Sequence, residues 1–319
     1  MFDAELDTFK TGIDLRAYAA AQGYQLDRKE SWRGSAVMRN VNGDKIVIKR
    51  NAADGRYMFY SVRDERDNGT IIDFVRARKG LNLGEIRTEL RPWIGQPPRP
   101  VPSFPPLIAT SKDRHRVEAE YAKTKDVTRH PYLENERALP YSLFQDRRFA
   151  GTIRVDARGN AIFPHLDGDG ICGFEKRNRG YKGFSSGGEK GLWLSREFSD
   201  DGRLVFFESA IDALSYHVLF RDEYTRYASI AGKPSPKQPE LIRAAIARMP
   251  AGSAIIAAMD NDDDGRKLAD IVRKAVELTG RADLTFRAHL PDAAKDWNDL
   301  LRARPLPPSS GRPKEAAPR

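Results

Sequence analysis

Short apolar segments alternate with longer amphipathic ones over residues 203–304, and this alternation is the strongest constraint on the fold. Four of the segments have the length and composition of buried strands: RLVFFE, YASIAG, SAIIAAMD and LTFRAHL. The segments that follow them, such as GRKLADIVRKAVELTG, are typical of helices that cover a core. Strands that alternate with helices in this way predict an α/β fold whose parallel sheet is covered on both faces.

Acidic residues stand where three of these strands end. Glu208 ends the first strand, Asp260 and Asp262 end the third, and Asp296 follows the fourth. Asp212 comes one helical turn after Glu208 and belongs to the same group. Because ligands of open α/β sheets bind beyond the carboxyl ends of the strands, we expect these side chains to lie close together.

Carboxylates that are crowded in this way repel one another and raise one another's pKa, so the group requires a positive partner. It contains only hard oxygen ligands, without histidine or cysteine, and such ligands suit Mg²⁺ or Mn²⁺. We therefore expect a divalent-cation site. Its candidate ligands are Glu208, Asp260, Asp262, Asp212 and Asp296.

The segment DNDDDG also matches the first half of a calcium-binding EF-hand loop. That loop requires Glu at its twelfth position, where this chain has Ile271. The preceding segment is also predicted to be a strand, whereas an EF-hand needs a helix there. A merely solvated acidic turn is the remaining alternative to a magnesium site.

Composition points to a nucleic-acid partner inside the cell. The net charge of +9 favours a polyanion. The single cysteine, Cys172, excludes an internal disulfide and a zinc site built from several thiolates, and it fits a reducing cytoplasm. No apolar run approaches the ~20 residues of a membrane helix, and MFDAELDTFK lacks the features of a signal peptide.

The N-terminal part is predicted to be a compact α+β module. KIVIKR and RYMFYSV are predicted strands, and residues 68–80 contain a predicted helix. Prolines are frequent between residues 97 and 106, which favours an extended linker or, alternatively, a Pro-x-x-Pro ligand. The basic, glycine-rich segment 176–191 is either a mobile loop that contacts phosphates or a plain solvated loop.

Two segments, VFFESAIDALS and AAMDNDDDG, resemble the Toprim domain of topoisomerases, bacterial primases and certain nucleases. The resemblance covers residues 201–303. It implies a Rossmann-like parallel sheet with flanking helices. It also implies that Glu208, Asp260 and Asp262 bind Mg²⁺ and are catalytic, with Glu208 able to act as acid or base.

Further segments are similar to bacterial replicative primases of the DnaG type: NAIFPHLDGDGICGFEKRN, HPYLENERALPYSLFQDRRF and LPDAAKDWNDLL. The resemblance places Lys176 and Arg177 toward the template or nucleotide, and we expect Arg179 and Lys182 to act with them. Asn298 stands where a second acidic residue is expected after Asp296.

GTIIDFVRARKGLNLGEIRTEL is similar to the helical end of the primase zinc-binding domain, but residues 1–95 contain no cysteine or histidine. The resemblance therefore implies a zinc-free relative of that domain, as in the primase-like Toprim proteins of plasmids and mobile elements. Its basic and aromatic residues are candidates for DNA contact, the alternative being a strand surface with core aromatics. They are Arg50, Arg56, Tyr57, Phe59, Tyr60 and Arg63.

Together these features predict a primase-like enzyme that makes primers on single-stranded DNA from nucleoside triphosphates. A helicase or plasmid-transfer proteins are its expected partners. A Toprim nuclease or nickase and a non-catalytic DNA-binding accessory protein are the alternatives. A topoisomerase would need a tyrosine nucleophile that the sequence does not single out. The expected parts are 1–95 (zinc-free module), 96–112 (linker), 113–200 (primase-core subdomain with the basic segment), 201–303 (Toprim) and 304–319 (disordered tail).

Overall fold

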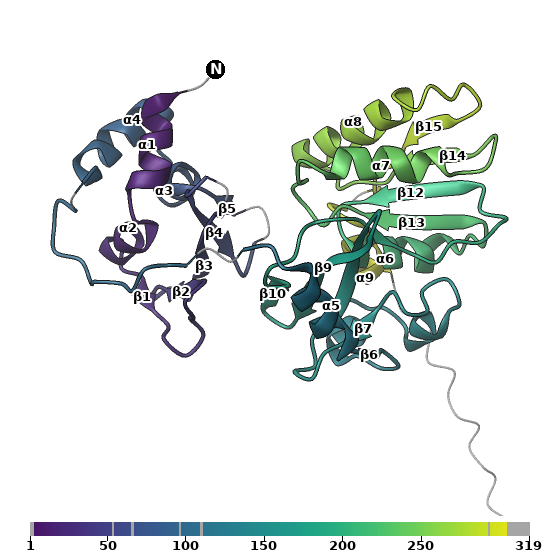
Figure 1. Cartoon of the computed structure of the whole chain (residues 1–319), viewed down its shortest axis with the longest axis horizontal. Helices are drawn as coiled ribbons and strands as arrows, with labels where there is room; N and C mark the ends of the chain where they lie inside the picture. The colour runs from purple at the N-terminus through teal and green to yellow at the C-terminus, as the bar shows by residue number, and fades with distance from the viewer. Residues whose placement is uncertain are drawn as a thin grey trace, which may run out of the picture. The chain divides into compact units, whose positions relative to one another are not determined.

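A computed structural model describes residues 3–52, 54–64, 67–95, 97–108, 111–292 and 294–304. The predicted disordered tail lies outside the described residues from 305 onward. The chain divides into two compact units, residues 1–112 with 180–182 and residues 113–179 with 183–319 (Figure 1). Within the described part, no helix combines the length and the apolar character needed to cross a membrane.

The first unit is an antiparallel sheet with helices packed on one face. The strands lie in the order β1-β2-β3-β4-β5, and the predicted strands 45–50 and 56–62 are β3 and β4. The elements are α1 (Ala4–Gly12), α2 (Leu15–Ala21), β1 (Gln25–Leu26), β2 (Ala36–Arg39), β3 (Lys45–Arg50), β4 (Tyr57–Ser61), β5 (Asn68–Gly69), α3 (Ile71–Lys79), α4 (Leu83–Leu90) and the 3-10 helix η1 (Arg91–Trp93).

Alternation along β3 and β4 builds the core of this unit. Ile48 pairs with Phe59 across the two strands, and both side chains are fully buried. The ring of Phe74 from α3 packs edge-on against Phe59 at a centroid distance of 5.3 Å. The apolar face of α3 therefore covers the inner face of the sheet, as the predicted amphipathic helix requires.

The proline-rich segment also belongs to this unit. Leu107 is buried in its core, and Phe104 packs against the same cluster. The Ile108 N–H donates to the Arg33 carbonyl at 2.8 Å, and the Arg16 guanidinium lies over the Phe104 ring. The expected linker 96–112 thus differs from the structure, because its apolar side chains find a place on the N-terminal core up to residue 108.

The second unit begins with an antiparallel sheet of order β10-β9-β8-β7-β6. The expected loop 176–191 is in part a strand pair in this sheet, since it contains the end of β9 and all of β10. The elements are α5 (Arg114–Ala122), β6 (Lys125–Asp126), the π-helix η2 (Tyr132–Glu136), the 3-10 helix η3 (Tyr141–Gln145), β7 (Arg154–Val155), β8 (Ala161–Asp167), β9 (Gly170–Asn178) and β10 (Tyr181–Phe184).

The predicted parallel sheet is confirmed, with the strand order β11-β13-β12-β14-β15. β12 to β15 are parallel to one another, and β11 is an antiparallel edge strand. Helices α7 and α8 cover one face and α6 and α9 the other (Figure 1). The elements are β11 (Trp193–Leu194), β12 (Arg203–Phe207), α6 (Ala210–Phe220), β13 (Thr225–Ser229), α7 (Gln238–Ala247), β14 (Ala254–Ala257), α8 (Asp263–Glu277), β15 (Thr285–Ala288) and α9 (Trp297–Ala303).

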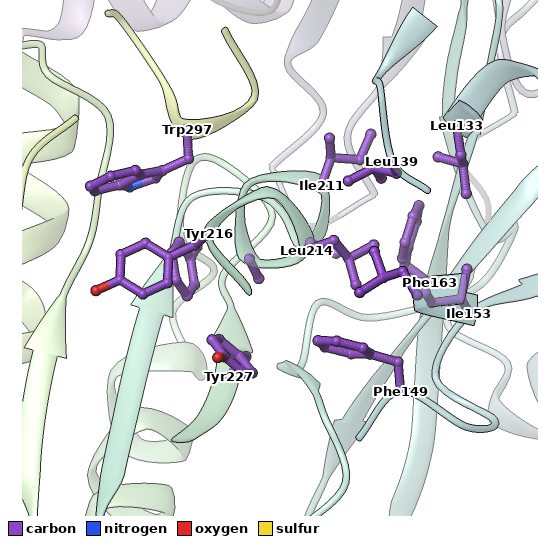
Figure 2. Close-up of a cluster of buried hydrophobic side chains, with 14 of the residues drawn as sticks. Leu133, Leu139, Phe149, Ile153, Phe163, Ile211, Leu214, Tyr216, Tyr227 and Trp297 are labelled. Atoms are coloured by element: carbon purple, nitrogen blue, oxygen red, sulfur yellow. The ribbon is translucent and has the colours of Figure 1, made fainter. Parts of the chain in front are cut away.

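One hydrophobic core joins the two sheets of the second unit. Leu214 of α6 lies at its centre (Figure 2). On either side of Leu214 lie Tyr216, Tyr227 and Trp297 from the parallel sheet and its helices, and Phe149, Ile153 and Phe163 from the preceding segment. The parts expected at 113–200 and 201–303 therefore share a core, which fixes one against the other.

Candidate active site

The carboxyl ends of β12 and β14 form the point at which the strand order reverses. These strands are neighbours, with Phe206 opposite Ala257. The connection from β12 through α6 leads to β13 on one side, whereas β14 lies on the other side of β12. Ligands of open α/β sheets bind at such a switch point, because the diverging connections leave a crevice there. Glu208 directly follows β12, and Asp260 follows β14.

The segment that carries Glu208 is fixed by its backbone. The Glu208 carbonyl accepts the Gly232 N–H at 2.9 Å and the Ser229 hydroxyl at 3.3 Å. Both partners belong to the end of β13 and the turn after it. Hydrogen bonds from the end of β13 and the turn after it therefore fix the backbone of Glu208, just before the start of α6.

Asp212 lies in the first turn of α6 and is buried. Its N–H donates to the Ser209 hydroxyl at 3.2 Å, and this hydroxyl donates to Asp212 Oδ2. Burial and the charge of Asp296 raise the pKa of Asp212 to about 7, and Glu208 contributes in the same direction. Asp212 is therefore close enough to Asp296 and Glu208 for their charges to act on it.

Asp260 is the most perturbed of these groups. Only 8% of the residue is exposed, and within the described residues its Oδ1 atom has no hydrogen-bond partner. Burial and the charges of Asp212, Glu208 and Asp296 raise the pKa of Asp260 to about 9. A buried carboxylate without a partner is costly, so this position favours either a proton or a cation.

Asp262 caps α8 instead of continuing the strand. Its Oδ1 accepts the N–H groups of Asp264 at 3.1 Å and Gly265 at 2.9 Å. The sequence analysis placed Asp260 and Asp262 at the end of the third strand, but β14 already ends at Ala257, so neither residue lies on it. Gly265 is required here, since a Cβ atom would overlap the Asp260 carbonyl oxygen. The strand before this turn also confirms that it is not an EF-hand.

Asp296 and Asn298 occupy the start of α9. Asp296 caps the helix by accepting the Asp299 N–H at 2.6 Å, and burial raises its pKa. Asn298 is buried and makes structural contacts. Its side-chain amide donates to Ser215 Oγ at 2.9 Å and to the Arg137 carbonyl at 2.7 Å.

Lys295 is a member of the site that the sequence analysis did not identify. Its ammonium lies 3.9 Å from Asp260 Oδ2 and 3.9 Å from Asp262 Oδ2. Its carbonyl accepts the Asn261 N–H at 2.8 Å, which joins the loop before α9 to the segment between the two aspartates. The only available signal was its position next to Asp296 in the sequence.

Two family models match the chain. Residues 205–301 match a family described as Toprim-like, and residues 131–201 match one described as a protein of unknown function (DUF3991). The chain carries a Toprim-like domain. Its match begins at Val205 in β12 and ends at Leu301 in α9, so it includes all of the acidic residues described above.

Among solved structures, the chain is similar to the primase fragment of the bacteriophage T7 primase-helicase protein, with 17% identity and a TM-score of 0.37 over 63% of this chain and 76% of that one. It is also similar to a DNA primase domain from Pseudomonas aeruginosa, with 20% identity and a TM-score of 0.34 over 48% of this chain and 53% of that one. No curated protein matches the chain.

The donor set of the Toprim-like domain fits a hard divalent cation. It offers carboxylate oxygens, and the buried Oδ1 of Asp260 has no hydrogen-bond partner among the residues that the structure describes. In the described part of the chain, no three histidine, cysteine, aspartate or glutamate side chains already stand together as a metal-binding group. Mg²⁺ needs only one or two carboxylates and keeps waters or phosphate oxygens as further ligands, so a partial set is sufficient.

The basic residues proposed to contact nucleic acid lie outside the Toprim-like domain, on the antiparallel sheet. Lys176 and Arg177 are in β9, Arg179 follows it, and Lys182 is in β10. Arg177 differs from the expectation, because its side chain is buried and pairs with Glu175 at 3.3 Å. Arg179 is exposed and pairs with Glu136 at 2.5 Å.

The first unit corrects one more expectation. Phe59, a candidate for stacking on DNA, is fully buried in the core because it faces α3. Tyr60, the next residue on β4, is 45% exposed and points to the opposite face of the sheet. Arg56 pairs with Asp7 at 2.8 Å.

Proposed function

We propose that this chain is a primase-like enzyme that performs divalent-cation-dependent nucleotidyl transfer on a single-stranded DNA template. One observation carries the proposal. Acidic side chains from two neighbouring strand ends and from the starts of two helices, α6 and α9, act on one another at the switch point, where Asp260 is buried and its Oδ1 has no hydrogen-bond partner among the described residues. The match to a Toprim-like family model supports it.

In this proposal Glu208, Asp260 and Asp262 hold Mg²⁺ or Mn²⁺, and Asp212 and Asp296 supply further negative charge around it. A bound cation of this kind neutralises phosphate oxygens and activates a hydroxyl group as a nucleophile. Glu208 is the group suited to accept the hydroxyl proton, because it is more exposed than Asp260 and Asp212 and directly follows β12 at the switch point.

Lys176, Arg179 and Lys182 are proposed to bind the template or the nucleotide by charge. Arg177 supports the same strand from inside through its ion pair with Glu175. Contacts of this type are made to phosphates and weaken as salt is added. Removal of Lys176 or Arg179 should therefore reduce DNA binding and its dependence on salt without changing cation affinity.

The experiment compares Asp260→Asn with Asp263→Asn in primer synthesis. Asp263 is the matched control, because it lies three residues away, has a side chain that is 85% exposed and pairs with Arg266. The proteins are incubated with single-stranded DNA, labelled nucleoside triphosphates and Mg²⁺ or Mn²⁺. We expect synthesis by the wild type and Asp263→Asn, and a loss of at least about 100-fold in Asp260→Asn.

The products separate this proposal from the alternatives. New oligonucleotides support the primase assignment. Shortened DNA in a cation-dependent and Asp260-dependent manner would instead make the chain a nuclease. DNA binding without either product would make it an accessory protein. Primer synthesis by Asp260→Asn at the wild-type rate would refute the proposed site.

A further inference from the structure

Lys295 places a positive charge at the carboxylates that are proposed to bind the cation. The ammonium comes from the loop between β15 and α9, and it lies equally far from Asp260 Oδ2 and Asp262 Oδ2, at 3.9 Å. The hydrogen bond between the Lys295 carbonyl and the Asn261 N–H fixes the backbone of this loop beside the two aspartates. The position of Lys295 is therefore determined by the fold.

The ion pairs of Lys295 are loose. A separation of 3.9 Å is longer than a hydrogen bond between an ammonium and a carboxylate, which is about 2.7–2.9 Å. The Lys295 side chain is also 37% exposed, so its ammonium can return to water without a large cost. This arrangement places a positive charge beside the two aspartates but does not bind the ammonium tightly.

The Oδ1 atoms of Asp260 and Asp262 have surroundings that differ from those of the Oδ2 atoms near Lys295. Asp262 Oδ1 is occupied by the N–H groups of α8, and Asp260 Oδ1 is buried. Oδ2 is therefore the oxygen that Asp262 can offer to a cation, and the ammonium of Lys295 lies 3.9 Å from it and from Asp260 Oδ2. A divalent cation that used both aspartates would need the place that the ammonium holds.

We propose that Lys295 is the resident counter-ion of Asp260 and Asp262, and that a divalent cation displaces it when the cation binds. The inference rests on the proposed function, because it assumes that these aspartates hold the cation. It follows that Lys295 stabilises the cation-free protein more than the cation-bound protein. Because binding of the cation must displace the ammonium, the affinity for the cation is lower than it would be without Lys295.

The test measures Mn²⁺ binding to the full chain by titration calorimetry and by the electron paramagnetic resonance of free Mn²⁺. Lys295→Met and Lys295→Gln remove the charge with side chains of similar length, and Lys295→Arg keeps it. We expect the two neutral variants to bind Mn²⁺ roughly 5- to 10-fold more tightly than the wild type, and Lys295→Arg to stay within about 2-fold.

Lys274→Met is the matched control for net charge. Lys274 is exposed on α8, and it lies eleven residues after Asp263, which is about 16 Å along the helix. Its removal changes the charge of the domain by the same amount but leaves the aspartates untouched. We expect its Mn²⁺ affinity to equal that of the wild type.

Melting temperatures provide a second readout that distinguishes displacement from a merely structural role. The neutral variants should melt lower than the wild type without cation and should gain more from saturating Mn²⁺. A structural role would lower both melting temperatures by the same amount. Three results would each overturn the inference. The first is an equal gain in melting temperature from Mn²⁺ in the wild type and the neutral variants. The others are Mn²⁺ binding that is unchanged or weaker in both neutral variants, and Mn²⁺ binding that is tightened as much by Lys274→Met as by the neutral variants.

Asp260→Asn separates a failure of this inference from a failure of the proposed function. If Asp260→Asn binds Mn²⁺ as tightly as the wild type, the cation site itself is wrongly placed. If Asp260→Asn loses binding while both neutral variants of Lys295 bind like the wild type, only the role of Lys295 is wrong.

Discussion

The backbone N–H of Asn298 donates a hydrogen bond to Asp212 Oδ1 at 3.2 Å, although the two residues are 86 positions apart. This bond joins the start of α9 to the first turn of α6, the two helix starts that carry Asp296 and Asp212. The side chain of Asn298 is directed to Ser215 and Arg137 by its own hydrogen bonds. The asparagine is therefore a link between helices, and an aspartate there would not simply complete the acidic group.

Asn298→Asp should destabilise the protein. The change removes two amide donors and places another carboxylate in a buried position near Asp212 and Asp296. We expect a loss of about 2–4 kcal/mol in the free energy of unfolding near neutral pH. Because the new carboxyl group repels Asp212 and Asp296 only when it is ionised, the loss in the free energy of unfolding should be smaller near pH 4. Urea denaturation at both pH values measures it.

Asp299→Asn is the control for this change. Asp299 is the next residue of α9, and its side chain is half exposed and pairs with Arg302. Its substitution should alter the free energy of unfolding by less than about 0.5 kcal/mol. Wild-type stability of Asn298→Asp at pH 8 would show that Asn298 is not the link described here.

Asp260→Asn should stabilise the protein when chelator removes divalent cations. The pKa of Asp260 is raised to about 9 in the folded state, mainly by burial and by Asp212, from the ordinary value of 3.8 for an aspartate. The unfolded chain therefore releases this proton at lower pH than the folded chain, and stability falls as pH rises between these values. Asparagine carries no such proton.

The stability difference between Asp260→Asn and the wild type should thus be near zero at about pH 4 and grow to at least about 1 kcal/mol by about pH 8. Thermal or urea unfolding in chelator measures it. Addition of Mn²⁺ should reverse the order, because only the wild type gains from binding. A difference that does not depend on pH would contradict the buried, ionisable state of Asp260.

The sequence predicted the parallel sheet because its strands are short apolar runs that alternate with amphipathic segments. Glu208 and Asp260 were located by the same pattern, since each follows a buried strand. Asp262 was a candidate from the same pattern, but its local structure was not predicted, because an acidic residue can equally follow a strand or cap a helix. Lys295 lies in a loop, so no periodic pattern of the sequence points to it, and its place beside Asp260 and Asp262 depends on a contact between two loops.

Tertiary packing explains the other differences. Helix α1 and strand β2 were not predicted; α1 buries only Phe9 fully and β2 is four residues long. Arg177 belongs to a basic, glycine-rich segment that is typical of a solvated loop, yet the side chain is buried in β9 beside Glu175. In each case the prediction used only neighbouring residues. The structure is instead decided by a contact with a residue that is distant in the sequence, or by a contact inside the sheet.

Arg78→Met should destabilise the first unit, which has no cysteine or histidine among residues 1–95. The Arg78 guanidinium donates to Asp67 at 2.5 Å and to Asp44 at 2.8 Å, and it lies over the ring of Phe74. It thereby ties α3 to the turns before β3 and after β4. We expect a loss of about 2–4 kcal/mol in the free energy of unfolding, because two partly buried carboxylates lose the guanidinium that pairs with them.

Hydrogen exchange of peptides from β3 and β4 in the full chain localises this loss. Arg78→Lys keeps the charge but cannot reach both aspartates with a planar group, so it should fall between the wild type and Arg78→Met. Arg76→Met is the control, since Arg76 is exposed on the same helix. Equal exchange in the Arg78 and Arg76 variants would exclude the proposed tie.

Leu107→Ala tests whether the proline-rich segment is part of the first unit. Leu107 is 8% exposed and packs in the N-terminal core, whereas its neighbour Ile108 is 58% exposed. Burial of a leucine makes its removal cost about 2–3 kcal/mol, while Ile108→Ala should cost less than about 0.5 kcal/mol. Hydrogen exchange of peptides from β2 and α3 should therefore accelerate in Leu107→Ala alone. Should both variants exchange like the wild type, residues 97–108 would act as the extended linker that their proline content favours.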